Sequence, residues 1–322
     1  GWCRTPFVAR SIVNVSGMSF GAISEPAVRA LSRGAQAAGC WLDTGEGGLS
    51  PFHLEGGCDV IMQIGTARYG VRNAAGEYDL DKIREIAARE TVRAFEIKLS
   101  QGAKPGKGGV LPGGKVTPLI ASIRGIPPGK DSISPNRHPD IASMDDLLDR
   151  IAWLRDLTGK PVGIKTAVGG RYFANELCER ILARGPAFAP DFFAVDGGEG
   201  GSGAAPQALA DHVGLSIDEA LPRVIDAIVA AGLKPRIRVI ASGKLVTSAR
   251  AAWALCCGAD FVNTARGFMF ALGCIQALRC QTNTCPTGIT THNPRLQRGL
   301  VVEEKWQRVA NYAANMNKEI DM

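Results

Sequence analysis

Three cysteines in the last quarter of the chain have the spacing of a ligand motif. Cys274, Cys280 and Cys285 follow a Cys-x5-Cys-x4-Cys pattern, and Pro286 comes directly after the third cysteine. Thiolates bind iron–sulfur clusters, and a terminal Cys-Pro recurs in ferredoxin-type sequences. Three cysteines instead of four would suit a three-iron cluster. The residues alone leave two alternatives open, which are a zinc site with His292 as a further ligand and three small core cysteines without a ligand.

Glycine-rich stretches follow two later apolar runs and have the composition of phosphate-binding loops. They read AVDGGEGGSGAAP and IASGKLVT, and VNTARGF follows them. Glycines let backbone N–H groups approach a phosphate, and loops after the last strands of a barrel commonly form such a site. We expect Gly243, Thr264, Ala265 and Arg266 to contact the phosphate. No G-x-G-x-x-G motif follows the first apolar run, which favours flavin mononucleotide (FMN) over a dinucleotide. The alternative is that these are ordinary turns of an α/β protein.

A glycine- and lysine-rich stretch, SQGAKPGKGG, follows the fourth apolar run. The cations in and around it are Lys98, Lys104, Lys107, Lys115 and Arg124. Fixed cations of this kind would hold the carboxylates of a dicarboxylic acid or stabilise the anionic form of a reduced flavin. A basic loop exposed to solvent is the alternative. Glu46, in the TGEGG turn, has the chemistry to transfer a proton or to hold an amino group.

The elements that must position these residues alternate along the chain. Short, near-continuous apolar runs are typical of parallel strands buried on both faces, and we predict eight: Ile12–Ser16, Cys40–Thr44, Val60–Ile64, Ala94–Leu99, Pro161–Thr166, Phe192–Asp196, Ile237–Ala241 and Phe261–Thr264. Helix-like stretches lie between them, at Glu25–Ala38, Leu80–Glu90, Met144–Leu157, Arg171–Arg184, Ile217–Ala231 and Thr247–Leu255. Eight strands alternating with helices favour a closed (β/α)8 TIM barrel over an open doubly wound sheet.

The predicted organisation is one domain over residues 1–322, with the barrel at about 10–272, a cysteine loop at 273–292 and a helical tail at 300–322. The segment Ser100–Ile141 interrupts the alternation and is rich in Gly, Pro, Lys and Ser. Loops of this length are usually functional or disordered. Because this one begins at the carboxyl end of a strand, on the catalytic face of such barrels, we interpret it as a substrate-site loop.

Composition excludes several classes of protein. A hydrophobic fraction of 45% and a charged fraction of 21% are ordinary for a soluble globular chain. The net charge of +6 comes from scattered basic residues, which argues against nucleic acid as a partner. No run of about 18 apolar residues predicts a membrane helix, and no secretory signal is visible, so we expect a cytoplasmic protein. The chain starts at Gly1 without methionine, so a preceding segment could add a membrane anchor.

Taken together, these motifs resemble the flavin-binding synthase domain of glutamate synthases. The matching strings run in the family's order from residue 13 to about 291, and they are VSGMSFGAIS, TGEGG, QIGTARYGV, KLSQGAKPGKGG, SISPNRHPDI, VDGGEGGSGAAP and CIQALRCQTNTCPTG. The resemblance implies FMN at the barrel mouth and a 3Fe-4S cluster beside it. It also implies that electrons pass from a donor through the cluster to the flavin. The flavin then reduces 2-iminoglutarate, formed from 2-oxoglutarate and ammonia, to L-glutamate.

The resemblance assigns roles to individual residues. It implies that the cofactor-binding residues are Met18 and Ser19 at the isoalloxazine, Gln63 and Lys165 at strand ends, and Gly198, Gly243, Ala265 and Arg266 in the phosphate region. It implies that the cluster ligands are Cys274, Cys280 and Cys285. It implies that the residues for substrate binding and proton transfer are Glu46, Lys98, Lys104 and Arg124.

The chain departs from the large enzymes of this family in the substrate loop and in its extent. Val110 stands where they carry glutamine, and Lys107 stands where they carry glutamate. The glutaminase domain and a pyridine-nucleotide domain are missing, and Cys3 is not an N-terminal nucleophile. We therefore expect free ammonia or an ammonia-supplying subunit, and a ferredoxin-like electron donor. Two further hypotheses are an FMN barrel for a different amino or oxo acid, and an electron-transfer or scaffold subunit without chemistry of its own.

Overall fold

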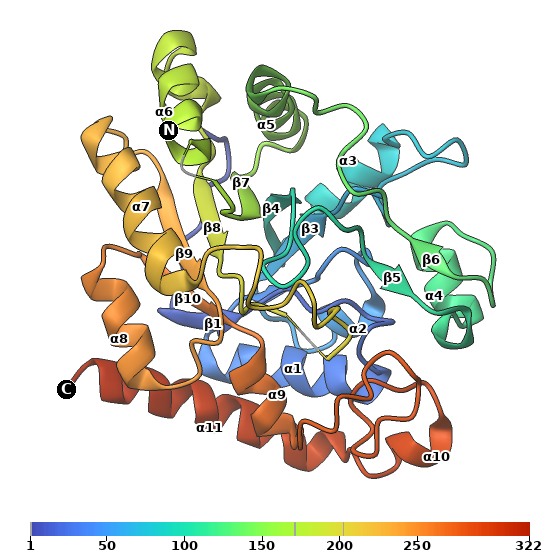
Figure 1. Ribbon diagram of the computed structural model, residues 1–322. Coiled ribbons are helices and arrows are strands. Elements are labelled where there is room, and N and C mark those ends of the chain that lie inside the picture. The colour runs from blue at the N-terminus through green and yellow to red at the C-terminus, as the bar shows by residue number, and fades with distance from the viewer. Residues whose placement is uncertain (1, 171, 202) are drawn as a thin grey trace.

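The computed structural model describes residues 2–170, 172–201 and 203–322. Within them, eight parallel strands close into a barrel in the order β1-β10-β9-β8-β7-β4-β3-β2 (Figure 1). The strands are β1 (Val13–Val15), β2 (Leu42–Asp43), β3 (Val60–Ile64), β4 (Val92–Lys98), β7 (Val162–Ala167), β8 (Phe192–Asp196), β9 (Arg238–Ser242) and β10 (Phe261–Thr264). Each overlaps one of the predicted runs, so the (β/α)8 barrel is confirmed.

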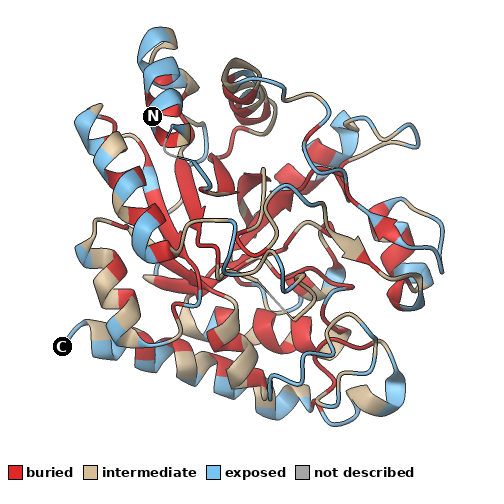
Figure 2. Ribbon diagram, in the orientation of Figure 1, coloured by how far each residue is buried: buried red, intermediate tan, exposed pale blue. Residues whose placement is uncertain are grey.

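Helices surround the barrel and shield its strands from solvent. Figure 2 shows the strands buried along nearly their whole length, whereas the helices are buried only on the side that faces the barrel. The larger helices are α1 (Glu25–Ala38), α3 (Leu80–Ala88), α5 (Met144–Thr158), α6 (Phe173–Arg184), α7 (Ile217–Ala230), α8 (Ser248–Cys256), α9 (Arg266–Leu272) and α11 (Val302–Ile320). The shorter ones are α2 (Pro51–Leu54), α10 (Pro294–Gln297) and the 3-10 turn η2 (Pro186–Phe188). Arg171, the predicted start of α6, lies outside the described residues, as do Gly1 and Ser202.

The helix ends follow the capping signals in the sequence. The Ser24 side chain accepts a hydrogen bond from the Ala27 N–H at the start of α1. Ser143 and Asp146 form a reciprocal capping box at the start of α5. Gly39 ends α1 with a φ of 71°, a left-handed conformation that favours glycine. Local sequence therefore places these boundaries, because a cap satisfies backbone groups that the helix itself leaves unpaired.

The segment after β4 is more regular than the predicted loop. It contains β5 (Val110–Leu111), the 3-10 turn η1 (Gly113–Lys115), α4 (Pro118–Arg124) and β6 (Ser132–Ile133). β5 pairs antiparallel with β6, outside the barrel. Thr117 caps α4, and Gly125 ends it with a φ of 65°. The short elements within the loop predicted at Ser100–Ile141 were not foreseen, because each is too short to show a hydrophobic period.

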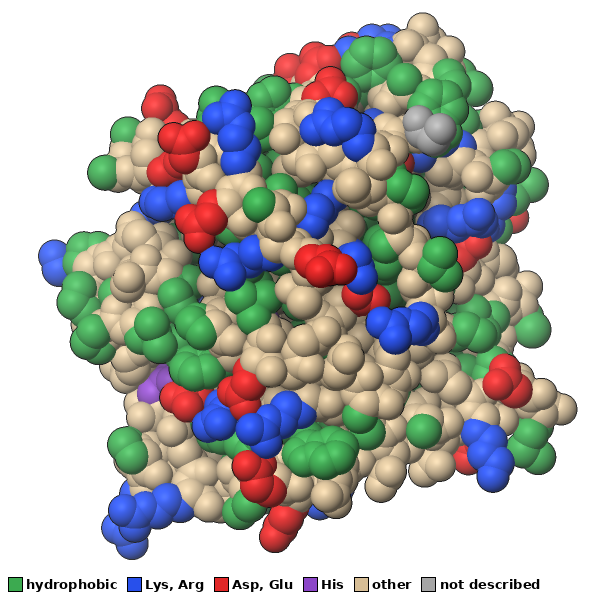
Figure 3. Space-filling model, turned by 180° about the vertical axis from the view of Figure 1, so that it is seen from behind, with side chains coloured by type: hydrophobic (Ala, Val, Ile, Leu, Met, Phe, Trp, Pro, Cys, Tyr) green, Lys and Arg blue, Asp and Glu red, His purple; other side chains and the backbone are tan. Residues whose placement is uncertain are grey.

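The C-terminal helix α11 packs against α1 and α9 along the outside of the barrel (Figure 1). Contact is close because Gly34 of α1 meets Val309, and Gly267 of α9 meets the Tyr312 ring. Asn317 near the end of α11 donates a hydrogen bond to the Ser11 hydroxyl at 2.9 Å, just before β1. No helix among the described residues is both long and apolar enough to cross a membrane. On the face shown in Figure 3, cationic and anionic side chains are interspersed.

Candidate active site

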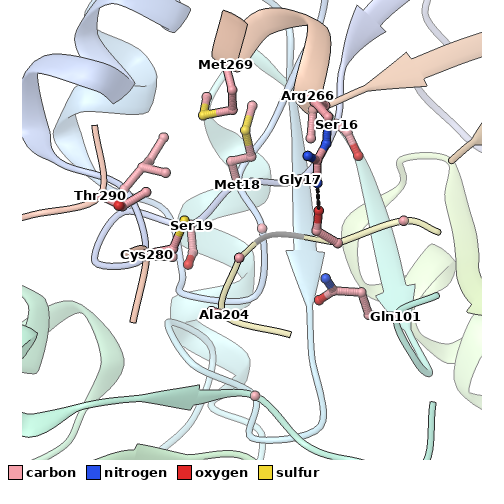
Figure 4. Close-up of a pocket in the computed structure, with 18 of the residues that line it drawn as sticks. Ser16, Gly17, Met18, Ser19, Gln101, Ala204, Arg266, Met269, Cys280 and Thr290 are labelled. Atoms are coloured by element: carbon pink, nitrogen blue, oxygen red, sulfur yellow. Dashed lines mark hydrogen bonds between the residues drawn. The ribbon is translucent and has the colours of Figure 1, made fainter. Parts of the chain in front are cut away.

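A cavity of about 250 Å³ lies where the carboxyl ends of the barrel strands meet the cysteine loop. Figure 4 shows residues from the β1–α1 turn, from the loops after β4 and β8, from α9 and from the cysteine loop around this one space. Among the predicted site residues, those that line it are Met18, Ser19, Glu46, Gln63, Lys98, Lys104, Arg124, Lys165, Gly243, Ala265, Arg266, Cys274, Cys280 and Cys285. Gly198 does not line it. The barrel therefore gathers nearly all of the predicted residues, although they come from distant parts of the chain.

A layer of polar side chains closes the bottom of the cavity inside the barrel. Gln63 donates from Nε2 to Glu96 Oε1 at 2.7 Å and to Asp43 Oδ2 at 3.3 Å. Burial, together with the neighbouring Asp43 carboxyl, raises the pKa of Glu96 to about 8, and burial also raises the pKa of Asp43. Two adjacent carboxyls in a dry interior cannot both ionise easily. We infer that Asp43 and Glu96 hold a proton between them at neutral pH.

Lys165 stands beside these carboxyls and reaches the cavity. Its Nζ lies 3.4 Å from the Ser16 hydroxyl oxygen at the end of β1. Burial opposes the charge of this ammonium, but Asp196, Glu96, Asp43 and Glu46 outweigh it and raise the pKa of Lys165 above its usual value. Lys165 is therefore a permanent cation in the cavity wall.

Glu46 is a carboxylate that lies among the cations on one side of the cavity. Its Oε2 lies 3.4 Å from Lys98 Nζ. Burial would raise the pKa of Glu46, but Lys98, Lys104 and Arg124 lower it below the usual value, so the group is ionised. A Cβ atom on Gly65 would come within 2.7 Å of the Glu46 side chain, and one on Gly109 would overlap its carboxyl. The two glycines therefore leave the room that Glu46 occupies.

Arg124 reaches the cavity from α4, outside the barrel. It is 4% exposed and donates to the Ser132 hydroxyl at 2.9 Å and to the Ser19 hydroxyl at 3.5 Å. Its guanidinium carbon lies 5.1 Å from the Tyr69 ring centroid. Burial lowers the pKa of Arg124, whereas the neighbouring Tyr69 and Glu46 oppose this lowering. The ordered elements after β4 thus add Arg124 to Lys98 and Lys165, which come from the barrel strands.

Three of the five residues predicted at the phosphate line the cavity, namely Gly243, Ala265 and Arg266. Arg266 donates to the Gly201 carbonyl at 2.9 Å, and Gly243 has a φ of 149° that favours glycine. Gly198 and Thr264 do not line the cavity. A Cβ atom on Gly198 would come within 2.3 Å of the Gly214 carbonyl oxygen, and the Thr264 hydroxyl accepts from the Gly267 N–H at 3.3 Å. The roles of Gly198 and Thr264 at the phosphate stay predictions.

The three cysteines of the motif are free and half-buried, and they line the same cavity. Cys274 Sγ accepts from the Gln276 N–H at 3.5 Å, and Cys285 Sγ lies 3.4 Å from the Thr287 hydroxyl oxygen. Burial opposes ionisation, but hydrogen bonds with Thr287 and Thr290 lower the pKa of Cys285 to about 7. Thiolates form readily at such a pKa.

No three His, Cys, Asp or Glu side chains converge on a single metal ion in the part of the chain that the structure describes. His292, the expected further ligand of a zinc site, bonds through Nε2 to the Gly21 carbonyl at 2.8 Å. The structure therefore offers no support for the zinc alternative. An iron–sulfur cluster at Cys274, Cys280 and Cys285 therefore stays a prediction.

Three carboxylates near the cavity were missed by sequence analysis. Asp43 and Glu96 form the proton-sharing pair, and Asp196 accepts from the Gly102 N–H at 2.7 Å and from the Ser242 hydroxyl at 3.0 Å. Asp196 therefore fastens the start of the substrate segment to β8. A signal was present, since each acid lies within or at the end of an apolar run, where a charge needs a partner or a function.

Comparison with known proteins shows which protein family this chain belongs to. The fold and the cavity define a (β/α)8 barrel with cationic side chains at the carboxyl ends of its strands. The chain belongs to the glutamate synthase family, since the model of the conserved region in glutamate synthase matches residues 3–322.

Two curated relatives and one solved structure illustrate the likeness. The glutamate synthase large subunit-like protein YerD of Bacillus subtilis is 46% identical over 317 residues, which cover 98% of this chain and 60% of that protein. The archaeal glutamate synthase [NADPH] of Methanocaldococcus jannaschii is 37% identical over 310 residues, covering 96% and 57%. The chain thus spans less than two thirds of these relatives. A mutant flavocytochrome b2 with benzoylformate has a TM-score of 0.57 at 14% identity, covering 99% of this chain and 67% of that chain, a likeness of fold alone.

Proposed function

We propose that this chain is an oxidoreductase that reduces 2-iminoglutarate, formed from 2-oxoglutarate and ammonia, to L-glutamate. It would do so with FMN and a 3Fe-4S cluster. A ferredoxin-like protein would donate the electrons, and ammonia would come free or from a partner subunit. The observation that carries this proposal is one cavity that joins a cationic group, glycine-rich strand-end loops and three free thiols. Membership of the glutamate synthase family supports it.

The residues around the cavity suit FMN. A Cβ on Gly17 would come within 2.8 Å of Gln63 Nε2, so only a glycine lets the backbone lie so close to the polar layer. We assign Met18, Ser19, Gln63 and Lys165 to the ring system. Gly243, Ala265 and Arg266 remain on the side proposed for the phosphate. When bound, FMN would supply hydride to the imine carbon, and the cluster would supply single electrons.

The cysteine loop suits a cluster in its donor set. Cys274, Cys280 and Cys285 are free thiols on one wall, and the buried ammonium of Lys115 lies beside them. Thiolates are the ligands that iron–sulfur clusters require, and a nearby cation favours thiolates over thiols. We therefore assign these three residues as the cluster ligands.

The cationic side of the cavity suits a dicarboxylic oxo acid. Lys98, Lys104 and Arg124 surround the Glu46 carboxylate, so three cations meet one anion at this point of the cavity before substrate binds. Burial and the neighbouring Lys98 lower the pKa of Lys104. A lysine of this kind gives up its proton more readily, and we assign Lys104 as the acid that protonates the imine nitrogen while hydride reaches the carbon. Glu46 holds the resulting amino group, which takes up a second proton from solvent to become an ammonium.

The test is reconstitution of the purified chain with FMN, iron and sulfide. We expect flavin absorbance and three irons per chain, and amination of 2-oxoglutarate with ammonia and a chemical reductant. A reconstituted protein with neither flavin nor iron contradicts the proposal. A full complement of both, with no glutamate formed in the assembled complex, supports instead an electron-transfer or scaffold subunit.

A second candidate is a similar reaction on a different amino or oxo acid. Val110, at the position where the large enzymes carry glutamine, lines the cavity. Lys107, the other departure, is exposed and does not line it. Only Val110 is thus placed to alter specificity. Reoxidation of the reduced protein by a panel of oxo acids with ammonia separates the two candidates, since response to another acid but not to 2-oxoglutarate favours the second.

A further inference from the structure

Lys115 is a buried cation that has no acidic partner among the described residues. It ends the turn η1 and is 1% exposed. Its Nζ donates to the Ala22 carbonyl at 2.7 Å and to the Cys280 carbonyl at 3.1 Å. Both acceptors are neutral. The sequence grouped Lys115 with the substrate cations, whereas the structure directs its ammonium to the backbone of the cysteine loop.

The surroundings of Lys115 make this ammonium costly. A buried charge without a counter-charge destabilises a protein strongly. Arg124, which lines the same cavity, carries a charge of the same sign. The ammonium is directed to the backbone of Cys280, and the thiols of the cysteine loop are the acidic groups on that side of the cavity.

The cysteine loop is also fastened to the segment that carries Lys115. Gln281 donates to the Val110 carbonyl at 3.4 Å, and Asn283 donates to the Gly114 carbonyl at 3.1 Å. Through Ala22, the same ammonium reaches the turn that carries Met18 and Ser19. Lys115 therefore lies at the junction of the three segments that surround the cavity on this side.

We propose that Lys115 is a positioning residue that provides the counter-charge of the cysteine loop and raises the reduction potential of the cluster held there. The inference rests on the proposed function, because it assigns a cluster to Cys274, Cys280 and Cys285. A fixed positive charge favours the reduced cluster, which carries one more electron than the oxidised one. Lys115 would thereby help to draw electrons from an external donor into this chain.

The test is a redox titration of the reconstituted protein, in which electron paramagnetic resonance measures the fraction of oxidised cluster. The test variant, Lys115→Met, removes the charge and keeps the length of the side chain. Lys115→Arg is the control that keeps the charge. Lys130→Met is the control that makes the same charge change at an exposed position. At the wild-type midpoint, we expect Lys115→Met to lower the ratio of reduced to oxidised cluster about tenfold, which is about 59 mV for a one-electron couple. We expect the two other variants to stay within about twofold of the wild type, a difference of about 0.4 kcal/mol.

Several outcomes overturn the inference. One is a Lys115→Met protein with full iron content and an unchanged potential. Another is an equal shift in Lys115→Arg, which would point to shape instead of charge. If Lys115→Met takes up no cluster, the iron content of three variants tests the inference. Loss of iron in Lys115→Met and Lys115→Gln, with iron retained in Lys115→Arg, supports a counter-charge role for Lys115. Loss of iron in all three variants overturns that role. A wild type without iron overturns the proposed function as well, whereas normal iron and amination with an insensitive potential overturn this inference alone.

Discussion

The cations around the cavity differ in what neutralises them. Lys98 pairs with Glu46 at 3.4 Å, and Lys165 lies among several carboxyls. Lys104 forms no ion pair within residues 2–170, 172–201 and 203–322, and burial together with Lys98 lowers its pKa. A lysine whose ammonium form is less stabilised donates its proton more easily, which suits Lys104 to proton transfer. Lys98 and Lys165, which have acidic neighbours, are suited to binding a substrate carboxylate.

Replacement of Lys104 by methionine tests this division. We expect kcat for amination to fall by about 10²- to 10⁴-fold, the usual contribution of a positioned general acid. In the wild type, the alkaline limb of the pH–rate profile should lie below the ordinary lysine pKa of about 10.4. Steady-state kinetics across pH measures both effects, with Lys130→Met as the control. Unchanged turnover in Lys104→Met would remove Lys104 from the reaction.

The shared proton of Asp43 and Glu96 predicts a pH dependence of stability. The pKa of Glu96 is raised to about 8 in the folded chain, so the folded protein binds more protons than the unfolded chain between pH 4.5 and that value. The free energy of unfolding should therefore fall as pH rises through this window, by at most about 1.4 kcal/mol per pH unit. Below pH 4.5 both states are protonated and the contribution levels off.

Glu96→Gln removes this proton exchange while its amide oxygen still accepts from Gln63. Denaturant unfolding of the cofactor-free protein at pH 5, 6, 7 and 8 measures the difference between the two proteins. We expect the variant to lose less stability than the wild type as pH rises. Parallel pH profiles would show that the buried pair does not hold the proton.

At the scale of elements, the segment after β4 adds cations to Lys98 and Lys165, which the barrel strands already carry. α4 supplies Arg124, η1 supplies Lys115, and Gly109, just before β5, lies beside Glu46. Asp196 and the Gly102 N–H fasten the start of this segment to β8. The segment and the barrel therefore lie so close together that a methyl group added at Gly109 would displace one from the other.

Gly109→Ala tests this closeness. The added Cβ would overlap the Glu46 carboxyl and push it away from Lys98. We expect kcat/KM for 2-oxoglutarate to fall at least about tenfold, since misplacement of catalytic groups by about 1 Å is costly. Gly114→Ala, in the same segment, adds a methyl group that meets nothing within 4 Å and should behave as wild type. Equal activity of both variants would contradict the placement of Glu46.

At the scale of the whole molecule, the net charge of +6 adds to the positive cavity. An anionic substrate is attracted by such a field, and salt screens the attraction. We expect KM for 2-oxoglutarate to rise as ionic strength increases from about 0.01 to 0.5 M, where the screening length falls well below 30 Å. A monocarboxylic oxo acid should show a weaker rise. Kinetics in sodium chloride measure this, and an equal response to both acids would argue against recognition of two carboxylates.

The sequence determined the barrel and the main constituents of the cavity. The eight apolar runs became the eight strands because a strand buried on both faces must be apolar throughout. Glu46, Lys98, Lys104 and the cysteines lie near the carboxyl ends of strands or in later loops, and closure of a parallel barrel brings those ends to one face. These predictions needed only local pattern and topology.

The tertiary structure decided what each polar group faces. Asp43 raises the pKa of Glu96 only because β2, β3 and β4 set both acids around Gln63. Lys115 points to the cysteine loop, whereas Gly198 and Thr264 lie outside the cavity lining. Such outcomes depend on contacts between residues far apart in the chain, and on the dry interior those contacts create. Charge spacing along a sequence carries no record of either.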